Sequence, residues 1–81
     1  MSKTYYRDQE GMEAFAIRLR EIRKSKGYSQ EQLANECDLP LSQISRIETS
    51  KINTSLSHIC LLARVLKVTP GELMNFKLNT K

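Results

Sequence analysis

Apolar residues recur along this chain at the three- and four-residue spacing of helical faces, in five segments separated by polar or turn-forming residues. The first segment runs from about Glu10 or Met12 to Lys26 and ends in basic residues before Gly27, which favours the left-handed conformation of a helix stop. Its apolar stripe consists of Met12, Phe15, Leu19 and Ile22. No strand is predicted, and the pattern therefore indicates an all-α fold.

Two capping motifs mark the starts of later helices. Ser29 and Gln32 have the spacing of a capping box, in which each side chain satisfies a free backbone amide at the helix start. They predict a second helix that runs to about Cys37. Thr69 and Glu72 repeat the pattern for a fifth helix, with a proline between them at the first helical position.

A sharp reversal is expected between the second helix and a third. Asp38 tolerates the positive φ of such a turn, and Pro40 fits the first turn of a helix that runs to about Thr49. Residues 49–54 then form a loop, and a fourth helix covers about residues 55–67. The expected order is therefore five short helices without long connections.

The chain is 81 residues long, a length that supports one small core. We expect the domain to cover residues 10–76, between an N-terminal extension of residues 1–9 and a C-terminal tail of residues 77–81. There is no run of about 18 apolar residues and no apolar stretch near the N-terminus. We therefore expect no membrane contact and a cytoplasmic location.

Positive charge is in modest excess, because 13 Lys and Arg oppose 9 Asp and Glu and give a net charge of +4. That excess suits a polyanionic partner but is small for a protein that binds by charge alone. Five basic residues fall close together with only Glu21 opposing them, and a solvated helix face is the plainest interpretation of most of them. They are Arg18, Arg20, Arg23, Lys24 and Lys26.

Residues that could form a catalytic or metal centre are sparse. His58 is the only histidine, and the three glycines form no phosphate-binding loop. Cys37 and Cys60 lie far apart at apolar helical positions, which favours buried, reduced thiols over a disulfide or a metal site. We therefore expect no enzyme activity, no metal, no cofactor and no small-molecule ligand.

The third predicted helix carries a distinctive outward edge. When Ile44 is turned inward at about 100° per residue, Ile47, Glu48 and Leu41 fall on the inner side. The outward residues are Ser42, Ser45, Arg46 and Thr49. Short side chains allow a helix to sit deep in a DNA major groove, and the planar fork of Arg46 can reach the O6 and N7 atoms of guanine. A plain solvated face is the alternative, because any small helical protein has a polar side.

Three separated motifs carry a resemblance to a known family. They read LRxIRxxxGxSQxxLA over residues 19–34, ISRIE over residues 44–48 and VTPxEL over residues 68–73. The chain resembles the helix-turn-helix family of phage repressors, Cro proteins and XRE-type bacterial regulators. This resemblance implies a compact five-helix bundle, the lambda-repressor-like DNA-binding domain, with the third helix as the recognition helix.

The family's functional positions can be carried over where this sequence matches them. The base-reading positions, together with Thr49 from the outward edge, are Leu41, Ser42, Gln43, Ser45 and Arg46. The phosphate-binding positions are Gln30, Lys51 and Asn53. The resemblance also implies an ion pair between Arg23 and Glu48, which agrees with the inward position of Glu48, since an unpaired buried carboxylate is costly.

Four positions depart from the family pattern. Asp38 stands where glycine is frequent in the turn, and Pro40 stands where a polar cap usually precedes the recognition helix. Leu41 replaces a common glutamine, so contact with a thymine methyl group replaces amide readout of adenine. Lys67 stands where glycine is frequent at the end of the fourth helix, a strained position if the chain turns left-handed there.

Apolar residues outside the core face raise the question of a protein partner. On the fourth helix, Leu61 and Val65 lie opposite the predicted core face, which begins at Leu56. The fifth helix region adds Met74, Phe76 and Leu78. These residues are either ordinary exposed side chains or a homodimer surface. Dimerisation is expected on energetic grounds, because two half-sites of a palindrome are needed to select an operator.

The resemblance implies a sequence-specific transcriptional regulator, a small repressor or autoregulator that reads a palindromic operator in double-stranded DNA as a homodimer. Two alternatives stay open at this point. One is an antitoxin-type protein-interaction module, and the other is the controller protein of a restriction-modification system. A neighbouring toxin-like gene would favour the first, and a neighbouring methyltransferase or endonuclease gene would favour the second.

Overall fold

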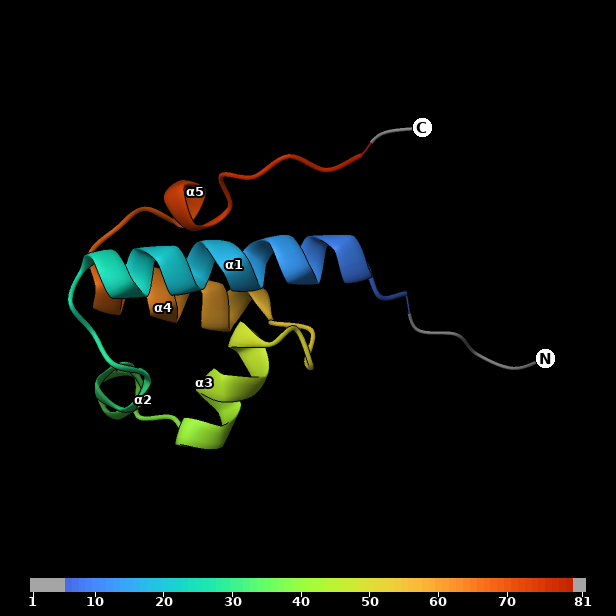
Figure 1. Cartoon of the computed structure of the whole chain (residues 1–81). Coiled ribbons are helices and arrows are strands. Elements are labelled where there is room, and N and C mark those ends of the chain that lie inside the picture. Colours follow the sequence, from blue (N-terminus) through green and yellow to red (C-terminus); the bar gives the residue numbers. More distant parts are fainter. Residues whose placement is uncertain (1–5, 80–81) are drawn as a thin grey trace.

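Five helices and no strand make up residues 6–79, the part of the chain that the computed structural model describes. The helices are α1 (Gln9–Ser25), α2 (Gln30–Cys37), α3 (Leu41–Glu48), α4 (Leu56–Leu66) and α5 (Pro70–Leu73). The long helix α1 separates two sides of the molecule: α2 and α3 lie below it in Figure 1, and α5 with the C-terminal segment lies above it. The predicted all-α bundle of five helices is confirmed.

Helix α1 begins at Gln9, which is one residue before the predicted start at Glu10 and three residues before the alternative start at Met12. The carboxylate of Asp8 causes the start, because its Oδ1 accepts a 2.9 Å hydrogen bond from the amide of Gly11. Tyr6 lies before this cap and is therefore outside the helix.

Side chains from all five helices meet in one core. The fully buried apolar side chains are Leu19, Leu33, Ile44, Ile47, Leu62, Leu66 and Leu73. Burying a side chain of this size is worth about 1.5–3 kcal/mol, so these residues supply much of the driving force for folding. Ala34 is also buried, and its small side chain allows α2 to approach its neighbours closely.

Four helices end with the same backbone motif. After each of α1 to α4, one residue adopts a left-handed conformation, and the next amide donates to a carbonyl five residues earlier. The left-handed residues are Gly27 (φ 79°), Asp38 (φ 56°), Ser50 (φ 55°) and Lys67 (φ 59°). Only one of them is glycine, so the strained position predicted at the end of α4 is confirmed, and α3 has a similar position that the sequence did not reveal.

The start of α3 differs by one residue from the prediction. Pro40 is the residue before the helix, with φ −62° and ψ 144°, and it does not occupy the first turn. No side chain caps this helix start. The ring of Pro40 pre-sets the backbone angle instead, and Leu41 becomes the first helical residue.

The C-terminal part of the fold contains two corrections. Leu56 is 75% exposed and not part of the core, because it is the first residue of α4, next to the capping residue Ser55. Helix α5 is a single turn, so Met74, Phe76 and Leu78 lie in the non-helical segment that follows it. This segment runs back along α1, where the amide of Asn79 donates to Glu10 Oε2 at 2.9 Å.

Candidate nucleic-acid interface

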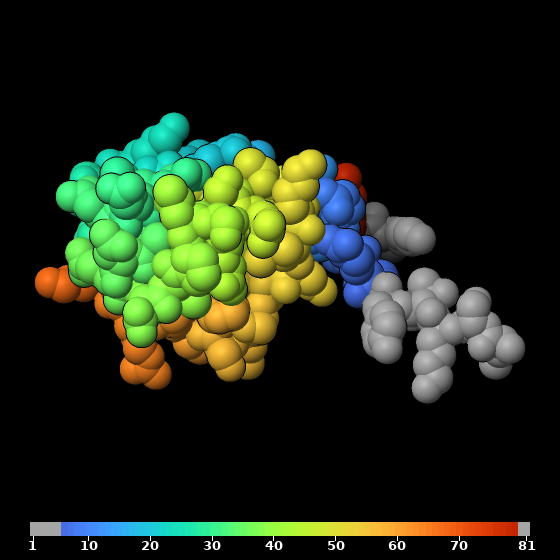
Figure 2. Space-filling view, turned by 90° about the horizontal axis from the view of Figure 1, so that it is seen from below, coloured from blue at the N-terminus to red at the C-terminus, as the bar shows by residue number. Residues whose placement is uncertain are grey.

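Helix α3 presents its polar edge to solvent. Ser42, Arg46 and Thr49 are exposed, whereas Ile44 and Ile47 are buried beneath them. Leu41, which the helical projection placed on the inner side, is 44% exposed because it lies at the start of the helix. Figure 2 views the molecule from the side of α2 and α3, and the surface of α3 (yellow-green) lies open between α2 and the yellow loop that follows.

The remaining predicted base-reading residues lie at the flank of this edge. Gln43 and Ser45 are half-buried. The amide nitrogen of Gln43 lies 3.4 Å from Nδ1 of His58, so α4 contacts the flank of α3 through this pair. Thr49 is exposed, and its hydroxyl donates to the carbonyl of Ser45 at 2.8 Å. The contact with His58 was not predicted, because it depends on how α4 crosses α3.

A buried ion pair holds α3 against α1. Glu48 is fully buried, and its carboxylate accepts two hydrogen bonds from Arg23, from Nε at 2.6 Å and from a terminal nitrogen at 3.0 Å. The side-chain amide of Gln30 adds a third bond at 2.9 Å, which links α2 to the same carboxylate. The paired hydrogen bonds from Arg23 fix the orientation of the guanidinium relative to the carboxylate as well as their distance. Helices α1, α2 and α3, which we call the reading unit, are therefore joined at the carboxylate of Glu48.

This network changes the meaning of Gln30, which the resemblance placed at a phosphate. Its Nε2 donates to Glu48, and the side chain is half-buried. An amide nitrogen carries two hydrogens, so one remains for another acceptor. Gln30 thus has a structural contact that the sequence did not indicate, and its phosphate contact stays a prediction.

Arginines of the basic cluster on α1 bind backbone carbonyl oxygens at the ends of α3 and α5 and in the turn that follows α1. Arg20 donates to the carbonyl of Glu48 at 2.9 Å, and Arg18 donates to the carbonyl of Glu72 at 2.8 Å. Arg23 also reaches the carbonyl of Tyr28 at 2.8 Å. Cations at helix C-termini satisfy free carbonyls and the helix dipole. These three arginines are therefore structural, and the interpretation as a solvated face fits only Lys24 and Lys26, which are exposed.

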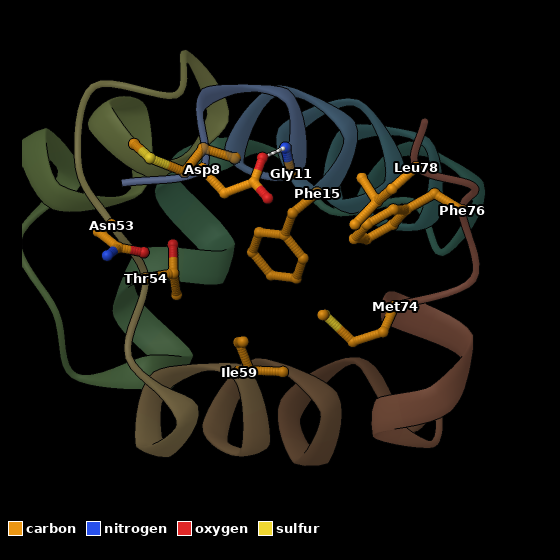
Figure 3. A pocket seen from close by; sticks show the side chains of 10 residues that line it. Asp8, Gly11, Phe15, Asn53, Thr54, Ile59, Met74, Phe76 and Leu78 are labelled. Atoms are coloured by element: carbon orange, nitrogen blue, oxygen red, sulfur yellow. Dashed lines mark hydrogen bonds between the residues drawn. The ribbon is translucent and has the colours of Figure 1, made fainter. Parts of the chain in front are cut away.

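The loop after α3 carries two predicted phosphate ligands that lie in different surroundings. Lys51 is exposed, and its backbone amide donates to the carbonyl of Arg46 at 2.8 Å, a hydrogen bond that forms the turn at the end of α3. Asn53 is exposed at one end of an apolar groove, as Figure 3 shows. Lys51 thus lies directly after the reading helix, and Asn53 lies nearer to the groove.

The apolar groove lies between the start of α1, helix α4 and the C-terminal segment, and it encloses about 220 Å³. Phe15 and Ile59 line its floor, and Met74, Phe76 and Leu78 line its side (Figure 3). Met74 is 45% exposed and Leu78 is 43% exposed. Three apolar residues of the C-terminal segment therefore contribute to one surface with α1 and α4.

Leu61 and Val65, the other two residues of the predicted dimer surface, lie elsewhere. Both are half-buried against the core rather than on a free outward face. The helical projection placed them opposite the core because it assumed that α4 has one buried side. In the structure α4 packs against both α2 and α5, so its buried arc is wider.

The cysteines are free thiols in the structure. Cys37 is buried and Cys60 is half-buried, so the predicted burial holds fully only for Cys37. Burial, together with the nearby carboxylate of Glu36, raises the pKa of the Cys37 thiol, which lowers its reactivity. Within residues 6–79 no cluster of three metal-binding side chains occurs, and no helix there is long and apolar enough to span a bilayer.

Two helices joined by a left-handed turn, with the second exposing a short polar edge and pinned to α1 by a buried ion pair, define a helix-turn-helix DNA-binding domain. The chain belongs to the helix-turn-helix family, because the family model matches residues 19–73. The prediction made from the three sequence motifs is confirmed.

Two controller proteins are similar to this chain over most of its length. The control protein C.BamHI of Bacillus amyloliquefaciens is 44% identical over 63 residues, which cover 76% of this chain and 78% of that protein. The crystal structure of the restriction-modification controller protein C.AhdI from Aeromonas hydrophila has a TM-score of 0.74 and 42% identity, over 76% of this chain and 94% of that chain.

A Neisseria protein described as a hypothetical transcription factor is a further relative. Its sequence, from Neisseria meningitidis serogroup B, is 35% identical over 68 residues, or 83% of this chain and 64% of that protein. The crystal structure under that description has a TM-score of 0.77 and 31% identity, over 91% of this chain and 86% of that chain. The chain is thus a DNA-binding regulator of the helix-turn-helix type, and it resembles controller proteins over most of its length.

Proposed function

We propose that the chain binds a palindromic operator in double-stranded DNA as a homodimer, with one α3 in the major groove of each half-site. The observation that carries this proposal is the open polar edge of α3 above a fixed core. The ion pair between Arg23 and Glu48 supports it, because a reading helix must keep its angle when it docks.

Each side chain of the edge suits a particular part of a base pair. Arg46 is exposed and free to place its planar fork on the O6 and N7 atoms of guanine. Ser42 and Ser45 are short enough to let the backbone approach and can bond to several bases. Leu41 suits the methyl group of thymine, since its exposed side chain has no hydrogen-bonding group.

The homodimer would use the apolar groove rather than Leu61 and Val65. Met74 and Leu78 are large apolar residues that line this groove and remain almost half exposed. A second copy of this chain is the partner that function requires, because two half-sites about one DNA turn apart multiply the selectivity of a single small domain.

Among the regulators that this fold serves, we favour the controller of a restriction-modification system. The support is the similarity to two controller proteins at 44% and 42% identity, over three quarters of this chain in each case. In this role the chain would govern transcription of the genes for the system and of its own gene. A methyltransferase or endonuclease gene beside this one is the observation that would separate a controller from other repressors.

The test of DNA reading starts with a selection of bound sequences from a random DNA pool, which should yield two inverted half-sites. Arg46→Ala should then weaken binding by roughly 1–3 kcal/mol per half-site and relax the preference at one base pair. Arg46→Lys keeps the charge and loses the planar fork, so it should also relax that preference. Unchanged affinity and preference in both variants would show that the proposed docking is wrong.

A further inference from the structure

The residue before the Asp8 cap and the first residue of α1 are both hydrogen-bonded to the loop that follows α3. A terminal nitrogen of Arg7 donates to the carbonyl of Lys51 at 3.2 Å, and the side-chain amide of Gln9 donates to the hydroxyl of Ser50 at 3.3 Å. These bonds join residues more than 40 positions apart. In Figure 2 the blue N-terminal segment lies beside the yellow loop, on the same face as α3.

This arrangement places the guanidinium of Arg7 against the backbone of a residue that is itself basic, Lys51. Arg7 and Lys51 are both exposed, and neither forms an ion pair with a carboxylate of residues 6–79. Exposed cationic groups without a carboxylate partner are available to bind an anion such as a phosphate.

We infer that Arg7 and Lys51 form one binding site for a backbone phosphate of the operator, at the edge of each half-site. This inference rests on the proposed function and extends it to a segment outside residues 19–73, which the family model matches. Arg7 uses one terminal nitrogen for the carbonyl of Lys51. Its other nitrogens remain free to bind a phosphate oxygen, and the loop carbonyl orients the guanidinium for that contact.

The site also explains the position of the N-terminal segment. Gln9 and Ser50 hold the segment against the loop, so Arg7 is ordered before DNA arrives and less side-chain entropy is lost on binding. A phosphate contact carries no base information. Arg7 should therefore contribute to affinity and to salt dependence, and it should leave base preference unchanged.

The experiment measures operator affinity of the full chain from about 50 to about 200 mM salt. Each phosphate contact adds about 0.9 to the slope of log affinity against log salt. Because a dimer holds two copies of the site, Arg7→Gln should reduce the slope by about 1.8, so that the wild type loses about 12-fold more affinity over this range than the variant does. Glutamine keeps a donor for the carbonyl of Lys51 but lacks the charge.

Two matched variants separate the phosphate contact from other effects. Arg7→Lys keeps the charge and should keep the wild-type slope. Lys24→Ala removes an exposed charge from the solvated face of α1, and it should also keep that slope. Circular dichroism establishes that each variant folds.

The outcomes distinguish this inference from the proposed function. A wild-type slope in folded Arg7→Gln overturns the inference, and so does a change in base preference, which would mean that Arg7 only braces the loop. If the wild-type chain selects no sequence from the random DNA pool, the proposed function fails instead. A reduced slope in Arg7→Gln with wild-type slopes in the two matched variants establishes the site.

Discussion

Removing Arg23 tests whether the buried ion pair controls the stability of the reading unit. In Arg23→Met the carboxylate of Glu48 stays fully buried and keeps one of its three side-chain hydrogen bonds, that from Gln30. Breaking a buried pair on one side costs about 3–5 kcal/mol. A domain of this length has a total stability of about 4–12 kcal/mol, so the variant should be only marginally folded.

The double variant Arg23→Met with Glu48→Met provides the decisive comparison. Both charges are then absent, and the remaining cost is the loss of partners for the Tyr28 carbonyl and the Gln30 amide, both in half-buried residues. We expect a loss of about 1–2 kcal/mol, because solvent can reach such groups in part. The double variant should therefore be more stable than either single variant.

Urea and thermal denaturation, both followed by far-ultraviolet circular dichroism, measure these differences in the free energy of unfolding. The midpoint of thermal unfolding should fall by roughly 12–40 °C in Arg23→Met. Lys24→Met is the matched control, since it removes an exposed charge from the next position of α1 and should change stability by less than about 0.5 kcal/mol. A single variant that loses no more than the control, or a double variant that loses the sum of the two singles, would refute the reasoning.

Two further predictions concern the dimer and the response to acid. Met74→Glu places a charge at the rim of the apolar groove and should leave only monomer in sedimentation experiments at tens of micromolar. Met74→Leu is the control and should leave dimerisation unchanged. A wild-type chain that stays monomeric with and without operator would contradict the interface. Hydrogen bonds from the Thr69 amide, and to a smaller extent from the Thr69 hydroxyl, lower the pKa of Glu72. The ionised Glu72 therefore stabilises the fold fully above the usual carboxyl pKa of about 4.3, and this stabilisation is lost as the pH falls through the lower pKa of the folded state. Melting curves from neutral pH to pH 3 should decline less steeply for Glu72→Gln than for the wild type, and equal declines would contradict this role.

Much of the fold could be predicted because the signals are local. A capping box depends on residues three positions apart, and the structure contains both predicted boxes, at Ser29 and at Thr69. The left-handed turn at Asp38 and the outward edge of α3 are likewise properties of a few neighbouring residues. The family motifs could be recognised for the same reason, since they are short and their spacing is preserved.

The wrong predictions concern residues whose surroundings come from distant parts of the chain. Leu56 was placed in the core because helical periodicity cannot show where the neighbouring helices end. Leu61 and Val65 were placed outside it because a helical projection cannot show that α4 packs on two sides. The C-terminal segment was assigned to α5, although it leaves that helix after one turn.

The sequence by itself determined which helices form, how they start and stop, and which edge of α3 is polar. Only the tertiary structure decided which groups the polar and charged side chains bind: Arg20 and Gln30 bind Glu48, while Arg7 binds the backbone carbonyl of Lys51. The physical reason is the separation along the chain of the residues that interact. Caps and periodicity act over a few residues, whereas the partner of a charged side chain is set by the way in which remote helices pack.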